Sequence, residues 1–188
     1  MKRITLLGCL LLNIIATPLF SLPAQIIIIR HAEKDSLGNL SQRGWERAGA
    51  LAPYLTKSSF LLNFGLPTAI FAARPTPNIF PYEVDENTLR CVQTVSPTAQ
   101  FLNLPIHSGY AKFQEEILAQ LILNNPNYDD KNILICWHHG RIPELAIALG
   151  ASSAPTFPYV FDQTWVITYS PSTDLIIYQQ ALLFGDAP

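Results

Sequence analysis

The sequence has little charge. Only 14% of its 188 residues are Asp, Glu, Lys or Arg, and the formal net charge is −2. This composition gives no electrostatic basis for binding nucleic acid or an anionic membrane surface. The chain also has no evident repeat and no low-complexity tract, while 49% of it is hydrophobic. These properties argue against disorder and predict one globular domain with a substantial core.

The N-terminal segment has the layout of a cleavable secretory signal. Lys2 and Arg3 precede an apolar stretch over 4–15 that is too short to span a bilayer. Small residues suited to a cleavage site follow it, at Ala16, Ser21 and Ala24. We therefore expect a signal peptide over 1–24 and a single exported domain, periplasmic or secreted, over 25–188, with no membrane span in the mature chain.

Cysteine is scarce, and two cysteines, Cys91 and Cys136, lie in the expected mature chain. An oxidising compartment would permit a disulfide between them. However, Cys136 lies within an apolar run, as a buried strand residue would. We therefore expect two separate buried thiols.

Apolar runs and helical periodicity alternate along the chain. Runs bounded by breakers lie at 26–29, 69–73 and 133–137 and predict strands. Apolar residues at helical spacing predict intervening helices over 41–55, 89–102, 117–122 and 143–149. Pro97 is expected to kink the second helix or start another, Trp45 to lie in the core, and His107 in a loop.

The C-terminal part has a different pattern. Apolar segments over 165–169 and 175–179 flank a turn and predict a β-hairpin. Strands that alternate with helices favour a parallel sheet covered on both faces. The predicted fold is therefore a three-layer α/β/α domain with a mostly parallel central sheet and a C-terminal edge hairpin.

Chemically active residues follow two of the predicted strands. Arg30 and His31 come after the first run, and His138 and His139 come after the third. In a parallel sheet, ligands bind beyond the carboxyl ends of the strands. Arg90, at the start of a predicted helix, could supply a second guanidinium. Guanidinium groups bind phosphate oxygens bidentately and a neutral imidazole can attack phosphorus, so the sequence predicts a phosphate site.

Four segments, in order, resemble the histidine phosphatase superfamily, also called the phosphoglycerate mutase-like family. They are "RHAEK" (30–34), "LSQRGWERAGALAPYL" (40–55), "TLRCVQTVSPTAQFLNLPI" (88–106) and "CWHHGRIPELAIALG" (136–150). The resemblance spans 25 to about 150, and the closing "ALLFGD" is similar to small bacterial members. It implies the fold predicted above and a phosphatase of the histidine acid type that acts on a small phosphorylated substrate.

The resemblance also implies roles for individual residues. His31 would be the nucleophile that forms a phosphohistidine, and Arg30, Arg90 and His138 would bind the phosphoryl oxygens, with no metal or cofactor. An unperturbed imidazole has a pKa of about 6.5, and neighbouring arginines would lower that pKa and keep the nucleophile neutral. The ungapped match to His-x-x-x-Ile-Pro-Glu-Leu favours His138 over His139 as the second histidine.

The sequence departs from the family pattern where a general acid is expected. Many members have a glutamate in a Glu-x-x-x-Gly context, and that segment is shortened here. Glu115 and Glu116 are weak candidates, because acidic residues in a first helical turn also serve as ordinary helix-dipole partners. Glu83, Asp85 and Glu86, in the long loop before Arg90, are weaker still. Without an acid the enzyme would be limited to good leaving groups, or would leave protonation to water.

We expect a phosphomonoester hydrolase, with three alternatives. The first is a phosphoglycerate mutase-like phosphotransferase, which export and the shortened acid segment disfavour. The second is a phosphohistidine protein phosphatase, whose cytoplasmic substrates conflict with a signal peptide. The third is a non-catalytic phosphate-binding module, against which the complete set of arginines and histidines argues.

Overall fold

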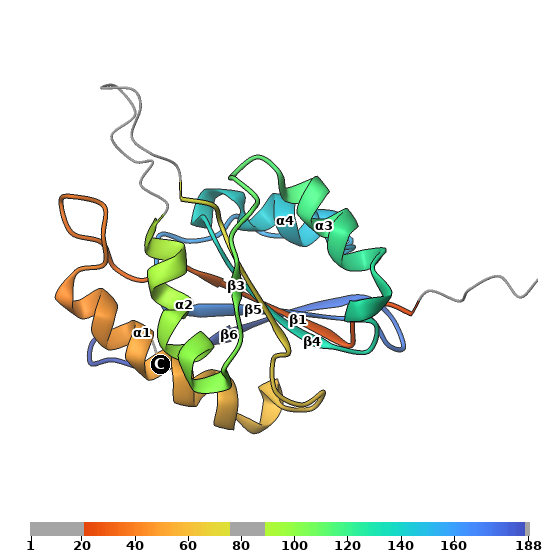
Figure 1. Ribbon diagram of the computed structural model, residues 1–188, viewed down its shortest axis with the longest axis horizontal. Coiled ribbons are helices and arrows are strands. Elements are labelled where there is room, and N and C mark those ends of the chain that lie inside the picture. Colours follow the sequence, from red (N-terminus) through yellow and green to blue (C-terminus); the bar gives the residue numbers. More distant parts are fainter. Residues whose placement is uncertain (1–20, 76–88, 187–188) are drawn as a thin grey trace, which may run out of the picture.

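The computed structural model describes residues 21–75 and 89–186 as a six-stranded mixed sheet in the order β3-β2-β4-β1-β5-β6 (Figure 1). The first four strands are mutually parallel, whereas β5 runs antiparallel to both β1 and β6. Their bounds are β1 Gln25–Arg30, β2 Ala69–Ala72, β3 Ile106–His107, β4 Asn132–Trp137, β5 Gln163–Thr168 and β6 Asp174–Gln179. The predicted mostly parallel sheet and C-terminal hairpin are confirmed.

The two central strands are buried along their whole length. All six residues of β1 and all six of β4 are buried, including the four isoleucines of β1. A strand covered on both faces has no solvent side, so its sequence is continuously apolar instead of alternating. This explains why uninterrupted apolar runs identified the centre of the sheet.

Helices cover both faces of the sheet (Figure 1). Helices α1 (Gln42–Lys57) and α2 (Leu89–Leu102) pack against each other on one face, and α3 (Glu115–Leu123) and α4 (Ile142–Ala148) on the other. Short 3₁₀ turns are η1 (Ser59–Leu61), η2 (Pro126–Tyr128) and η3 (His139–Arg141). The three-layer architecture is therefore confirmed.

Local signals explain several helix boundaries. The Ser41 hydroxyl accepts a hydrogen bond from the Gly44 backbone N–H at 3.1 Å and so caps α1, as its position predicted. Helix α4 ends just before Gly150, whose φ of +102° suits glycine. Pro97 lies inside α2, which remains one helix through Leu102 and does not restart at the proline.

Two local predictions were wrong. Trp45 is 46% exposed, because the buried stripe of α1 runs through Ala48, Leu51 and Leu55 and the indole lies beside it. His107 belongs to the two-residue strand β3, where it pairs with Phe71 of β2. Such a short strand has no periodicity of its own, and the neighbouring strand alone defines it.

The segment just before β1 also belongs to the folded unit. The Leu22 carbonyl accepts a hydrogen bond from the Asp130 backbone N–H at 3.0 Å, and the Ala24 N–H donates to the Lys131 carbonyl at 3.0 Å. In the part of the chain that the structure describes, none of the helices has the length and apolar character needed to cross a bilayer.

Candidate active site

The parallel pairing of β1 with β4 brings the two predicted histidines together. Arg30 lies opposite Trp137 in the register, so His31 and His138 leave the sheet from adjacent strand ends. Their ring centroids are 6.2 Å apart. The third predicted residue, Arg90, arrives from the first turn of α2 and contacts His31 directly. The structure therefore assembles at one rim residues that are far apart in sequence.

Hydrogen bonds define the tautomer of His31. The Nε of Arg90, which can only donate, lies 3.0 Å from His31 Nε2, and the carbonyl of Ala32, which can only accept, lies 2.8 Å from His31 Nδ1. The neutral ring therefore carries its proton on Nδ1 and a lone pair on Nε2. The side chain is 1% exposed, so this arrangement is held inside the protein.

The surroundings of His31 disfavour its protonated form. Burial is the largest effect and lowers the pKa of His31 well below its ordinary value, and the positive charge of Arg90 lowers it further. Arg30 and His138 act in the same direction, while the Ala32 carbonyl opposes them. The imidazole is therefore neutral at neutral pH, as a nucleophile must be.

Arg30 is held by the loop that precedes β5. Its Nη1 donates to the Val160 carbonyl at 2.7 Å, and its guanidinium carbon lies 3.9 Å from the ring centroid of Phe161 and 4.8 Å from that of Tyr159. Burial lowers the pKa of Arg30, and the charge of Arg90 contributes to this. Within the described ranges, the buried Nε of Arg30 makes no hydrogen bond, so it remains available to an anion.

Thr94, which the sequence did not single out, links the loop after His31 to α2. Its hydroxyl accepts from the Ala32 backbone N–H at 2.9 Å and donates to the Arg90 carbonyl at 2.7 Å. Thr94 lies one turn after Arg90, so both side chains face the same side of the helix. The i, i+4 spacing was the signal that placed Thr94 beside Arg90. Nothing in the sequence linked Thr94 to Ala32.

Both histidines after β4 lie near His31. The His139 ring centroid is 6.4 Å from that of His31, close to the 6.2 Å of His138. His138 is the more buried, at 8% exposure, and is the one whose charge lowers the pKa of His31. His139 begins η3 and packs edge-on against Tyr159, with centroids 5.3 Å apart. The choice between them stays a prediction.

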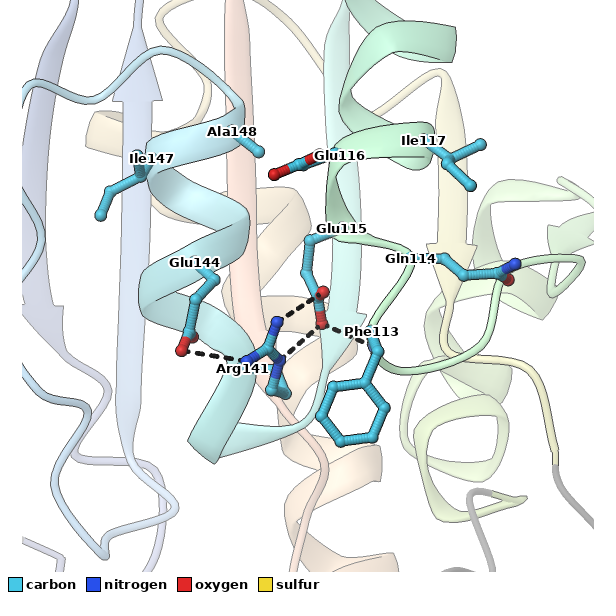
Figure 2. Close-up of a pocket in the computed structure, with 9 residues that line it drawn as sticks. All are labelled: Phe113, Gln114, Glu115, Glu116, Ile117, Arg141, Glu144, Ile147 and Ala148. Atoms are coloured by element: carbon cyan, nitrogen blue, oxygen red, sulfur yellow. Dashed lines mark hydrogen bonds and ion pairs between the residues drawn. The ribbon is translucent and has the colours of Figure 1, made fainter.

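Glu115 is buried, and its carboxylate forms an ion pair with Arg141 (Figure 2). Its carboxylate accepts from Trp137 Nε1 at 3.0 Å and from Nε and Nη2 of Arg141 at 3.1 and 3.0 Å. Burial opposes ionisation of Glu115, but the hydrogen bonds from Arg141 and Trp137 outweigh it and lower its pKa. A general acid needs a raised pKa, so this environment does not suit that role.

The other acidic candidates receive no support from the structure. Glu116 is exposed and lines the same cavity as Glu115, a space of about 440 Å³ between α3 and α4. Glu83, Asp85 and Glu86 lie outside the described residues.

A second charged cluster holds the loop that follows His31. Arg47 of α1 is 2% exposed and donates to the Glu33 carboxylate at 2.7 Å and to the Asp186 carboxylate at 2.7 Å. Hydrogen bonds from Arg47 lower the pKa of Asp186 to about 2. A Cβ on Gly44 would collide with the Glu33 backbone carbonyl, so the glycine permits this close approach. The C-terminal tail is thereby tied to the loop two residues beyond His31.

The two cysteines that the structure describes form no disulfide, as the sequence predicted. Cys91 and Cys136 are both free and buried. Burial raises the pKa of Cys136 well above its ordinary value, so the thiol is not a nucleophile at neutral pH. Among residues 21–75 and 89–186, no three His, Cys, Asp or Glu side chains gather as a metal site.

By sequence, no protein-family model and no curated protein matches the chain. By structure, the chain is similar to the protein histidine phosphatase SixA complexed with tungstate (TM-score 0.55, 16% identity, 83% of this chain and 97% of that one). It is also similar to the mycobacterial glucosyl-3-phosphoglycerate phosphatase Rv2419c complexed with VO3 (TM-score 0.51, 15% identity, 84% of this chain and 100% of that one). The chain therefore has the α/β/α fold found in these two histidine phosphatase superfamily members.

Proposed function

We propose that this protein is a phosphomonoester hydrolase that acts through a phosphohistidine on His31. One observation carries the proposal. The Ala32 carbonyl holds the proton on Nδ1, and the Nε2 lone pair is presented to a guanidinium donor in a site that keeps the ring neutral. Nε2 is therefore preset to attack a group that arginine binds, and phosphate is such a group.

Hydrolysis of the ester takes place in two half-reactions and needs no reactant besides water. In the first half-reaction, Nε2 of His31 forms a bond to phosphorus while the bond from phosphorus to the ester oxygen breaks. The leaving oxygen takes a proton from solvent water as the alcohol departs, and the second half-reaction returns a proton to solvent. In the second, a water oxygen forms a bond to phosphorus, the phosphorus–nitrogen bond breaks and the water loses a proton. Inorganic phosphate and neutral His31 result.

Arg30, Arg90 and His138 would bind the phosphoryl oxygens in both half-reactions. Arg90 Nε lies 3.0 Å from the His31 nitrogen that would attack phosphorus, and the buried Nε of Arg30 makes no hydrogen bond to any residue that the structure describes. Both guanidiniums are held in place before substrate arrives. Charge that is positioned in advance stabilises the transferring group without reorganisation, which is usually the largest catalytic term. We also propose that the enzyme is of the histidine acid type, which rests on the resemblance of its sequence motifs alone.

A second candidate is the hydrolysis of phosphohistidine in proteins. The carboxylate at Glu115 is committed to Arg141, which favours a substrate whose leaving group departs without a strong acid. SixA, a fold neighbour, is described as a protein histidine phosphatase. Release of phosphate from a phosphohistidine peptide, compared with an alkyl phosphate, distinguishes the two candidates.

We also propose export of the protein, on the composition of residues 1–24 alone. The contacts of Leu22 and Ala24 with residues 130–131 would survive a cut after Ala16 and would be lost after a cut at Ala24. Mass spectrometry of the protein recovered from a periplasmic fraction tests both points. Full-length protein in the cytoplasm would contradict the proposal.

The nucleophile is tested by trapping the intermediate. Rapid acid-free quench of the enzyme with ³²P-labelled aryl phosphate should yield an acid-labile, base-stable phosphoryl-enzyme. His31→Ala should yield none, while His107→Ala, a histidine on the outer strand β3, should label like the wild type. Wild-type turnover by His31→Ala would overturn the proposal.

A further inference from the structure

The loop before β5 carries aromatic side chains to the rim of the candidate active site. Phe157 is buried and packs on Trp165 with ring centroids 5.3 Å apart, which anchors the loop in the core. Beyond this anchor, the Phe161 ring lies 6.0 Å from the His31 ring. The Tyr159 ring lies 5.3 Å from that of His139 and 6.5 Å from that of Phe161. The rings of Phe161 and Tyr159 therefore line one side of the candidate active site.

Tyr159 differs from its neighbours in exposure. It is 74% exposed, although Arg30 and His139 both pack against it. Those two contacts fix the position of the ring beside the phosphate-binding arginine, and the rest of its surface is open to solvent. A large aromatic side chain that is held in place but uncovered is typical of a binding contact more than of a core residue.

We propose that Tyr159 is a stacking platform for an aromatic ring in the substrate, so that the preferred substrates are phosphate esters of alcohols or phenols that carry such a ring. This inference rests on the proposed function, because it takes the phosphoryl group to lie against His31 and Arg30. With phosphate held there, the organic part of the ester leaves toward the rim, where Tyr159 lies. A planar ring stacks on tyrosine, whereas a saturated ring of similar volume gains only the apolar contact.

The test measures binding with a matched pair of ligands that cannot be hydrolysed. The probes are 2-phenylethylphosphonate and 2-cyclohexylethylphosphonate, which differ only in whether the ring is aromatic. We expect the wild type to bind the phenyl compound roughly two- to tenfold more tightly in a calorimetric titration, the range expected from one stacked pair. Tyr159→Phe should keep this preference, and Tyr159→Leu should bind both compounds equally.

The ratio of the two affinities isolates stacking from other losses. Removal of the tyrosine also uncovers Arg30, but that change weakens both phosphonates alike and cancels in the ratio. Phe101→Leu, at an aromatic that is 63% exposed on α2, is the matched control and should keep the wild-type ratio. Melting temperatures check that each variant is folded. No preference in the wild type, or an unchanged preference in Tyr159→Leu, would overturn the inference.

A parallel activity assay separates this inference from the proposed function. Benzyl phosphate and cyclohexylmethyl phosphate have leaving groups of similar basicity, so their kcat/KM ratio reports the ring and not the chemistry. If the wild type shows the phosphonate preference but hydrolyses neither these two esters nor phenyl phosphate, whose leaving group needs no acid, the platform stands and the proposed function fails. If both esters are hydrolysed equally well and both phosphonates bind equally, the platform fails and the hydrolase stands.

Discussion

Replacement of Glu115 by glutamine distinguishes a structural carboxylate from a general acid. In the structure the Glu115 carboxylate accepts four hydrogen bonds. Two come from the Arg141 guanidinium and one from the Phe113 backbone N–H (Figure 2), and the fourth comes from Trp137 Nε1. Glutamine has the same shape but only one acceptor oxygen, and its NH₂ group would face the donors of Arg141. The change therefore removes an ion pair and creates a clash between donors.

The expected loss of unfolding free energy follows from how deeply Glu115 and Arg141 are buried. Loss of one partner from a fully buried ion pair costs about 3–5 kcal/mol. Glu115 is 3% exposed but Arg141 is 29% exposed, so water can hydrate the released guanidinium. We therefore expect Glu115→Gln to lower the free energy of unfolding by roughly 2–3 kcal/mol at pH 7. Glu116→Gln, at the exposed neighbouring position, is the matched control and should change it by less than about 0.5 kcal/mol.

The pH dependence of stability has a definite sign. Because the folded pKa of Glu115 is lowered, its stabilising contribution is complete above the ordinary glutamate pKa and is lost as pH falls through the folded value. Urea unfolding of the wild type and Glu115→Gln should therefore differ most at pH 7 and converge in acid. A difference that grew as the pH fell would contradict this account of the ion pair.

The catalytic assay compares leaving groups. Arg141 ends η3, which directly follows His138, so a loosened ion pair should reduce turnover of every substrate by a similar factor. The ratio of kcat/KM for an aryl and an alkyl phosphate should then stay within roughly threefold of the wild type, because no interaction with the leaving oxygen is lost. A positioned acid would instead give a selective loss of roughly 10²–10⁴ on the alkyl phosphate. That selective loss in Glu115→Gln would refute the structural role.

Three further outcomes test the rest of the site. His138→Ala should lower kcat by roughly 10²–10³, because it removes the proposed donor to the transferring group. His139→Ala should lower kcat by less than about tenfold. If steady-state kinetics gave the reverse order, the ungapped match that selected His138 would be wrong. Asp186→Asn should cost about 2 kcal/mol of unfolding free energy, since Arg47 lowers the pKa of Asp186 from 3.8 to about 2. This contribution is complete above pH 3.8 and is lost as pH falls through about 2, so denaturant titrations of the two proteins should converge in acid. Gly44→Ala should destabilise by roughly 1–3 kcal/mol, because the added Cβ meets backbone that cannot swing aside; an unchanged melting temperature would contradict this packing.

Much of the fold could be predicted because its signals are local. Four consecutive isoleucines identify a strand buried on both faces, and the apolar spacing after Ser41 identifies a capped helix. Parallel pairing then requires that residues after β1 and β4 meet at one rim, which is why His31 and His138 could be placed together in advance. The two-residue strand β3 was not predicted, because its pairing with β2 defines it.

The sequence by itself determined which residues can carry the chemistry, because the order of strands, helices and motifs assigns Arg30, His31, Arg90 and His138 to one end of the sheet. Only the tertiary structure decided what each polar group contacts. Glu115 is an ion-pair partner because Arg141 contacts it from another element. Tyr159 stays exposed because a different residue of its loop packs into the core. Propensity and periodicity act over one or two turns of chain, whereas these contacts join residues tens of positions apart. They are set by how the layers pack, so no local pattern encodes them.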